Sequence, residues 1–412
     1  MVVINMNNIF TYHTQQGLKV IFVKKEGFVK GYCGIGCKYG GANIRFTMDR
    51  KSFQSPYGIA HFIEHKLFQM PDGSDAFLTF NKQNASSNAY TATDKTMYYF
   101  TKNEEIADSL KLLIEMYFTP VFTEEGIARE KKIIQSEIHM YQDNPGYKIT
   151  QRGLKLLYPN DDYSYAITGD DESVVHTTIQ NMYDAYHAFY TPENSVLCIV
   201  GDYDKDEVFS FVEEVMSRLT FSLAEAKKLP TIQSKGPLKP TMVEENISQD
   251  EALILVRMDD ITNQDSLGCE KILGVLESIL SVSSEFYQSL NKKKLFDNDI
   301  DYQVITYKES SYIMITAPSK KPEAFAKTIL KKLKSLTEED INPKLVELYL
   351  RHLKSKNILN QDSIESLGDT ILSLALEDID YEASLEEILC LSLEDLKKCI
   401  PLIQKGKMTY LI

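Results

Sequence analysis

Three residues with the spacing of a metal site stand near the start of the chain: His61, Glu64 and His65, in the sequence His-Phe-Ile-Glu-His. The flanking residues 57–60 and 66–68 contain no proline and include apolar residues suited to a buried helix. Positions i, i+3 and i+4 are neighbours on a helix, so both imidazoles and the carboxylate would share one face. Catalytic zinc takes such nitrogens at about 2.0–2.1 Å, a ligand from elsewhere, and a water. Glu64 is then the candidate base.

A solvated helix face is the alternative to a metal site, so the prediction depends on a further ligand. Thr123-Glu-Glu is a favourable start for a helix that extends to about Gln142, where Asp143-Asn-Pro-Gly would end it. Glu130 and Glu137 lie two turns apart on this helix and point the same way. Glu130 alone is typical of a charged surface. Glu137 lies among apolar residues, and it needs a partner if it is buried.

The composition indicates a globular protein without affinity for nucleic acid. The chain has 412 residues, 43% of them hydrophobic, which is enough for two or three domains with ordinary cores. Its net charge of −14 argues against a nucleic-acid surface, which needs concentrated positive charge. The longest wholly apolar runs have five residues, far short of the roughly 20 of a membrane span.

The cysteines and the N-terminus predict a cytoplasmic protein with free thiols. The six cysteines form no C-x-x-C pair, and the one close pair is Cys33 and Cys37. Residues 1–8 lack the basic region, the apolar stretch and the cleavage site of a secretory signal.

The secondary-structure pattern predicts strands and helices of an α+β fold. Residues 9–48 alternate and are rich in glycine, which favours hairpin strands. After the motif we expect a short helix over 75–83 and then a pair of strands, Ser87–Asp94 and Lys95–Thr101, rich in threonine and tyrosine. Residues 103–117 have the apolar spacing of a helix.

The second half repeats the order of elements of the first half, which predicts two copies of one fold. The strand, helix and Thr-Glu-Glu pattern of residues 97–142 recurs with an offset of 214. At this offset Glu130 and Glu137 correspond to Lys344 and Arg351, and the segment that matches the motif has no histidine, so only the first copy can hold metal. We predict a catalytic domain over 1–221, a linker over 222–241 and a repeat domain over 242–412.

Taken together, the motif, the strand pair and the helix that carries Glu137 resemble the inverted-zincin family of pitrilysin, insulysin and the mitochondrial processing peptidase. The resemblance rests on three ordered blocks: Gly58-Ile-Ala-His-Phe-Ile-Glu-His, Ser87-Asn-Ala-Tyr-Thr, and Ser136-Glu-Ile-His-Met-Tyr-Gln-Asp-Asn-Pro. Glu137 follows His65 by 72 residues, within the family's spacing. The length resembles that of the small-subunit bacterial branch.

The resemblance implies a set of roles. His61, His65 and Glu137 would bind one Zn²⁺ with water at the fourth position, and Glu64 would be the general base. Glu130 would adjust the metal affinity or the activity of the site without binding the metal itself. Asn88 and Ala89 would contact a peptide bound as an added strand. The implied fold is two homologous domains, each a mainly antiparallel sheet covered by helices, that form half of a clamshell chamber. The implied activity is cleavage of short unfolded peptides or peptide precursors.

One departure from the family predicts a partner chain. The family's second-half Leu-Arg, followed by a tyrosine, is here Leu290-Asn291 with Tyr302 further on, so the arginine is missing. We expect a heterodimer with a homologous chain that lacks the zinc motif, unless Tyr302 and one of the lysines at 292–294 replace the arginine. The alternative functions are a non-catalytic structural or partner subunit and, less favoured because only three ligands are visible, a binding module stabilised by zinc.

Overall fold

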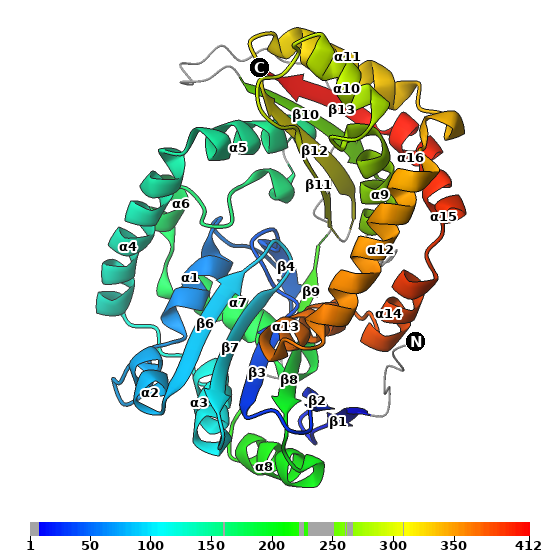
Figure 1. Cartoon of the computed structure of the whole chain (residues 1–412). Helices are drawn as coiled ribbons and strands as arrows, with labels where there is room; N and C mark the ends of the chain where they lie inside the picture. Colours follow the sequence, from blue (N-terminus) through cyan, green and yellow to red (C-terminus); the bar gives the residue numbers. More distant parts are fainter. Residues whose placement is uncertain are drawn as a thin grey trace. The chain divides into compact units, whose positions relative to one another are not determined.

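The computed structural model describes residues 8–159, 161–221, 226–229, 251–259, 261, 267–307 and 309–412 (Figure 1). The chain forms two compact units that are not continuous in sequence. Unit 1 comprises Met1–His139, Ala166–Thr231 and Leu359–Glu382, and unit 2 comprises Met140–Tyr165, Ile232–Ile358 and Ala383–Ile412.

Unit 1 is built on a six-stranded sheet with the order β1-β2-β8-β3-β7-β6. Strand β2 pairs with β8 in parallel, and the other pairings in this sheet are antiparallel. The strands are β1 (Ile9–His13), β2 (Lys19–Lys24), β3 (Lys30–Cys37), β6 (Ala85–Thr91), β7 (Thr96–Asn103) and β8 (Ser195–Gly201). A small second sheet has the order β5-β4-β9, with β4 (Arg45–Met48), β5 (Lys51–Gln54) and β9 (Ala226–Lys228).

Both faces of the large sheet are covered by apolar side chains. The larger cluster joins one face to α1, α3, α4, α7 and α8, and the smaller one joins the other face to α13. The helices of this unit are α1 (Ile59–Lys66), α2 (Ala76–Lys82), α3 (Ala107–Phe118), α4 (Glu124–Gln142), α6 (Asp171–His176), α7 (Ile179–Phe189), α8 (Lys205–Ser217) and α13 (Ile364–Leu376), with the 3-10 helix η3 (Pro192–Asn194). Helix α4 extends three residues into unit 2. The predicted helices over the motif, 75–83, 103–117 and 123–142 are confirmed.

Unit 2 has a four-stranded antiparallel sheet with the order β11-β12-β10-β13. Its strands are β10 (Glu251–Met258), β11 (Asp301–Thr306), β12 (Ser311–Pro318) and β13 (Lys407–Leu411). Its helices are α5 (Pro145–Leu157), η2 (Asp162–Ser164), α9 (Gly268–Leu280), α10 (Glu285–Lys292), α11 (Pro322–Lys334), η4 (Glu338–Asp340), α15 (Leu393–Lys397) and α16 (Ile400–Lys405), while α12 (Pro343–Asn360) and α14 (Tyr381–Cys390) cross the boundary between the units.

The predicted repeat is confirmed by strand order. In unit 1 the neighbours β8-β3-β7-β6 have the same order as β13-β10-β12-β11 in unit 2. The long helix expected in the second half is present as α12, but the offset of 214 does not hold for it. Thr337-Glu-Glu does not begin the long helix: it caps the 3-10 helix η4, where Thr337 and Asp340 form a capping box, and α12 begins at Pro343. The offset of 214 therefore does not pair Glu137 with Arg351.

Each unit contains a helix from the other half of the sequence. Helix α5 packs on β10 and β13, where Gly153 leaves no room for a side chain against Leu253 and Leu255. Helix α13 packs on β3 and β8. The predicted boundaries at 221 and 242 stay a prediction, because most of the linker segment 222–241 lies outside the described residues. In its described part, β9 pairs with β4.

The structure agrees with two simpler expectations. None of the six cysteines, all of which lie in the described residues, forms a disulfide. Within the described ranges, no helix has the length and apolar character needed to cross a bilayer.

Candidate zinc centre

Helix α1 presents the motif from within the core of unit 1. Gly58, with φ of 85°, begins the helix in the left-handed conformation that glycine adopts without strain. Ile59, Phe62 and Ile63 are at most 1% exposed and anchor the helix in the larger apolar cluster. Because these residues fix the rotation of α1, the two histidines and Glu64 all emerge on its remaining face.

His61, His65 and Glu137 meet at one point. The Nε2 atom of His61 lies 3.7 Å from Oε2 of Glu137, and the Nε2 atom of His65 lies 3.8 Å from the same oxygen. One ligand atom from each of the three residues lies within 4.8 Å of the others. Among the described residues, this is the one group of three or more His, Cys, Asp or Glu side chains close enough to share a metal ion. The two imidazole rings are tilted, with centroids 4.5 Å apart.

The donor set fits a tetrahedral metal. Ligand atoms at about 2.0–2.1 Å from zinc in tetrahedral geometry are roughly 3.3–3.5 Å from one another, close to the 3.7 and 3.8 Å between the two histidines and Glu137. Burial, followed by the charge of His65, lowers the pKa of His61 to about 3. His61 is therefore neutral at physiological pH, and a neutral imidazole is the form that binds a metal.

His65 is held by a carboxylate on its far side. Its Nδ1 atom lies 3.0 Å from Oε1 of Glu130, which places a donor N–H on Nδ1 and leaves Nε2 facing Glu137. Burial lowers the pKa of His65, but the bond to Glu130 and the nearby carboxylate charges outweigh it, so the net pKa is raised. The ammonium of Lys66, a residue only 3% exposed, lies 3.9 Å from the other Glu130 oxygen and donates to Gln69 at 2.9 Å.

Glu64 stands outside the ligand group. Its side chain is buried and accepts a hydrogen bond of 2.7 Å from the Thr91 hydroxyl at the end of β6. Burial raises the pKa of this carboxyl, and the hydrogen bonds from Thr91 oppose the rise. A buried carboxyl with a raised pKa, beside a metal site and not among its ligands, has the properties of a general base.

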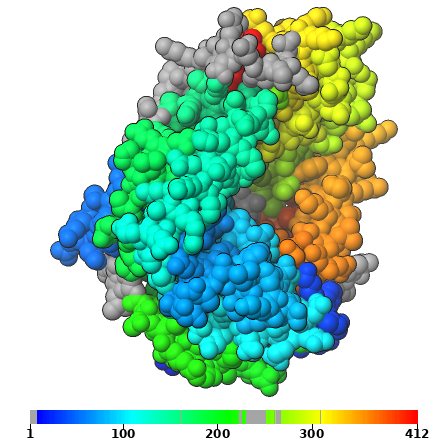
Figure 2. Space-filling model, turned by 90° about the vertical axis from the view of Figure 1, so that its left-hand side faces the viewer, coloured from blue at the N-terminus to red at the C-terminus, as the bar shows by residue number. Residues whose placement is uncertain are grey.

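Helix α4 supplies both glutamates from its inner side. Its outer side is part of the surface, in turquoise in Figure 2, where Ile133 and Met140 are exposed. Ile134 and Ile138 are buried. Of the four apolar residues near Glu137, two are therefore buried and two face solvent. The partners of the Glu137 carboxylate are the two histidines.

The predicted substrate strand lies at an edge. Strand β6 is the last strand of the sheet and pairs with β7. Asn88 is exposed, and its side-chain oxygen accepts the Ala89 N–H at 2.9 Å. Since this N–H is bonded to a side chain of the same strand, a peptide could replace Asn88 as its partner.

Among the described residues of unit 2, the position that corresponds to the candidate zinc centre has no metal-binding set. Thr306 ends β11 as Thr91 ends β6, and its hydroxyl lies 2.6 Å from the Cys269 thiol on α9. Tyr349 on α12 donates to Glu270 on α9 at 2.7 Å, in a position like that of Glu130 beside His65. These two contacts preserve the architecture of the site without its ligands.

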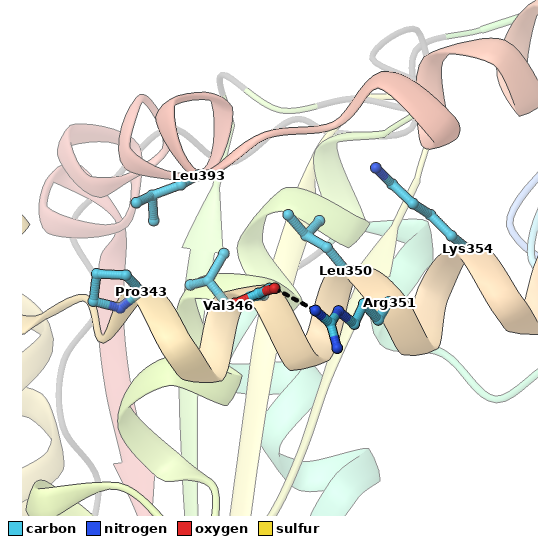
Figure 3. Close-up of a pocket in the computed structure, with 7 residues that line it drawn as sticks. Pro343, Val346, Leu350, Arg351, Lys354 and Leu393 are labelled. Carbon is cyan, nitrogen blue, oxygen red and sulfur yellow. Dashed lines mark hydrogen bonds and ion pairs between the residues drawn. The ribbon is translucent and has the colours of Figure 1, made fainter.

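A groove of about 290 Å³ lies along α12 in the same unit (Figure 3). It is lined by Pro343, Val346, Glu347, Leu350, Arg351, Lys354 and Leu393. Arg351 is paired with Glu347 at 2.6 Å, and the lining contains no histidine or cysteine.

Sequence reasoning missed two neighbours of the zinc centre. Thr91 is part of the Ser87-Asn-Ala-Tyr-Thr segment, and the sequence assigns it no function. Alternation along β6 nevertheless places it on the same face as Ala89. Lys66 follows the motif directly. Lysine is almost never buried without a partner, and no local pattern marks it as buried here.

Comparison with known proteins agrees with the fold. Residues 52–170 match the insulinase family, peptidase family M16, and residues 176–353 match the peptidase M16 inactive domain. An uncharacterized zinc protease of Bacillus subtilis, YmfH, is 31% identical over 330 residues, which cover 77% of this chain and 76% of that protein. A second one, YmxG, is 25% identical over 75% of this chain and 76% of its own.

Solved structures show the same architecture. A putative M16-like peptidase from Alicyclobacillus acidocaldarius superimposes with a TM-score of 0.88 at 24% identity over 98% of both chains. A protease from Helicobacter pylori has a TM-score of 0.82 at 19% identity, again over 98% of both. The fold and the sequence matches thus define a two-unit α+β chain of the peptidase class. It belongs to peptidase family M16, the insulinase family, in its small bacterial branch.

Proposed function

We propose that this chain is a zinc-dependent endopeptidase that cleaves short unfolded peptides or peptide precursors. The observation that carries the proposal is the meeting of His61, His65 and Glu137, from helices 72 residues apart in sequence, beside a separate buried carboxyl on Glu64. Three protein ligands leave one position open, which is typical of catalytic zinc, whereas structural zinc is closed by four.

The residues of the candidate zinc centre would have three different roles. His61, His65 and Glu137 would hold one Zn²⁺, which when bound supplies a Lewis acid and lowers the pKa of coordinated water toward neutrality. Glu64 would take the proton from that water, for which its carboxylate must be ionised. Glu130 would keep His65 in the tautomer that presents Nε2.

Metal content and peptide turnover, measured on the same preparations, test this proposal. We expect one zinc per wild-type chain and, in the presence of the homologous partner chain, cleavage of an unstructured fluorogenic peptide. Glu64→Gln should keep the zinc and lose about 10²–10⁴-fold in kcat. Glu137→Gln should lose both. Zinc content that survives Glu137→Gln and His65→Ala unchanged would contradict the ligand assignment, and loss of zinc in Glu64→Gln would contradict the role of Glu64.

The same measurements separate the alternatives. A non-catalytic subunit, suggested by the match of the second half to an inactive domain, would show no turnover in any complex. A zinc-stabilised binding module would hold zinc, bind peptide and leave it intact. The intact ligand set and the neighbouring carboxyl favour the enzyme.

Substrate, we propose, pairs with the outer edge of β6 at Asn88 and Ala89. Ala89→Pro removes the outward N–H, and its bond to the Asn88 side chain indicates that β7 does not use it. We expect KM to rise at least about tenfold with zinc retained, since one main-chain bond and its neighbours are lost. Ala89→Gly, which weakens the strand but keeps the N–H, is the control for general damage to β6. A KM unchanged in Ala89→Pro would refute the edge-strand assignment.

A heterodimer is the assembly that we propose. Asn291 stands on the exposed side of α10 where the family resemblance leads us to expect arginine. Tyr302 does not replace it freely, because its hydroxyl is bonded to Glu277. A homologous chain with the arginine would supply the missing substrate contact.

A further inference from the structure

The Thr91 hydroxyl connects the edge strand to the candidate base. Thr91 is the last residue of β6, and its hydroxyl donates to Oε2 of Glu64 at 2.7 Å. The preceding residue, Tyr90, points to the opposite face of the sheet and donates to Asp369 on α13 at 3.0 Å. Alternation along the strand therefore directs Thr91 to the face that carries α1.

This bond restricts a side chain that otherwise has freedom to rotate. A glutamate has three side-chain torsions. The Thr91 hydroxyl is the one side-chain group that donates to Glu64 within the described ranges, and the backbone N–H of Thr91 adds a second interaction with the carboxyl. Anchoring Oε2 leaves Oε1 as the oxygen free to accept a proton. Glu64 is 9% exposed and Thr91 is partly buried, so access of bulk water to the bond is limited.

We propose that Thr91 is a positioning residue that holds Glu64 in the orientation needed for proton abstraction. The proposal rests on the proposed function of Glu64 as general base. Thr91 keeps its own proton throughout and touches neither the ligand group nor the reacting atoms. Because it ends the strand that would receive the peptide, the base is anchored to the same element that positions the substrate.

The internal repeat provides a matched control. Thr91 is opposite Thr96 in the β6–β7 pair, and Thr306 is opposite Ser311 in the β11–β12 pair, so both threonines occupy the final position of an edge strand. Thr306 contacts the thiol of Cys269 instead of a carboxylate. Thr306→Val thus removes the same kind of contact from a unit that has no base.

Three variants test the proposal by steady-state kinetics. Valine keeps the shape and strand preference of threonine, so Thr91→Val removes the hydroxyl with little other change. We expect kcat to fall roughly 10- to 100-fold, with KM within about threefold and zinc content unchanged, because a misplaced base costs rate and not binding. Thr91→Ser restores the donor and should recover most of kcat. Thr306→Val should behave as wild type.

Crystal structures of the same variants provide a readout that does not need activity. In Thr91→Val the Glu64 carboxylate should occupy more than one rotamer, whereas Thr91→Ser and Thr306→Val should keep a single one. An ordered Glu64 in Thr91→Val would overturn the inference, as would wild-type kcat in Thr91→Val or failure of Thr91→Ser to recover it. An inactive wild-type chain with a reconstituted partner would instead count against the proposed function, and the crystal result would still decide the role of Thr91.

Discussion

His61 and His65 lie on one helix face, yet their pKa values shift in opposite directions. Burial dominates at His61, whose Nδ1 atom is buried without a hydrogen-bond partner in the described part of the chain, and its pKa falls to about 3. His65 is also desolvated, but Glu130 stabilises its charged form. The pKa values of the two histidines therefore shift in opposite directions because only His65 has a carboxylate hydrogen-bonded to its Nδ1 atom.

Glu130→Gln tests how much that carboxylate contributes. The amide can still accept the Nδ1–H of His65, but it has no charge, so the ligand becomes less basic. We expect the zinc dissociation constant to rise roughly 10- to 100-fold, measured by competition with a chromogenic chelator. Glu125→Gln, an exposed position on the same helix, should leave it unchanged. Equal affinities in both variants would show that Glu130 is only a surface charge.

Asp369 provides a pH prediction away from the zinc centre. Burial raises the pKa of its carboxyl, against the opposing effects of Tyr90 and Lys95. A carboxyl whose pKa is raised by folding stabilises the fold fully below its unfolded pKa of about 3.9, and this stability is lost as pH rises through the folded value. The free energy of unfolding of the wild-type protein, minus that of Asp369→Asn, should therefore decrease as the pH is raised from acidic to neutral.

Urea unfolding of both proteins over that pH range measures the difference. The asparagine oxygen can still accept the Tyr90 hydroxyl, so the packing against α13 should persist. A difference that instead grows with pH would mean that the ionised Asp369 is stabilised by its neighbours.

At the scale of the elements, the start of α1 decides how the motif is presented. A Cβ atom on Gly58 would lie 2.4 Å from the Thr168 carbonyl oxygen, a backbone atom that cannot rotate away. The left-handed conformation at this position adds a cost for any other residue. Helix α1, which carries the candidate ligands His61 and His65, is therefore held close to the segment near residue 168 by a contact that only glycine allows.

Gly58→Ala should destabilise unit 1 by more than the roughly 1–2 kcal/mol that a left-handed alanine costs by itself. Gly73→Ala is the control, because Gly73 has φ of 81° but nothing within 4 Å of its Cβ position. Urea unfolding of the metal-free proteins measures both, which keeps zinc binding out of the comparison. Equal losses in the two variants would contradict the close approach to Thr168.

At the scale of the whole molecule, the two units have diverged from one repeat. Unit 1 retains the candidate ligands and the candidate base. Unit 2 retains the strand order and the Thr306–Cys269 contact, and its described residues include no set of candidate metal ligands. Residues 291–294 are exposed and include three lysines but no arginine. This division is the basis for expecting a second chain.

The purified chain alone should bind one zinc and cleave peptides poorly. Addition of a homologous chain that carries arginine and tyrosine in its second half should raise kcat/KM about 10²-fold, the effect of a missing substrate contact. Asn291→Arg should recover part of this activity without a partner, and Asn291→Gln should not. Full activity of the wild-type chain alone, unaffected by a partner, would refute the heterodimer while leaving the zinc centre intact.

Local sequence patterns determined the elements that carry the site. The i, i+3, i+4 spacing predicts a shared helix face for His61, Glu64 and His65, since a helix has 3.6 residues per turn whatever surrounds it. The same periodicity predicts that Glu130 and Glu137 share a face of α4. The order of elements predicts the repeat, and the richness in threonine and tyrosine predicts β6 and β7.

Only the tertiary structure decided which of these faces meet. Strand β8 pairs between β2 and β3 although more than 150 residues separate it from both, and α13 from the second half covers the sheet of unit 1. The hydrogen bond from Thr91 to Glu64, the buried ammonium of Lys66 and the pKa difference between the two histidines all follow from such long-range packing. Local spacing reports neighbours within a turn or a strand, whereas burial and hydrogen-bond partners depend on contacts between segments distant in sequence.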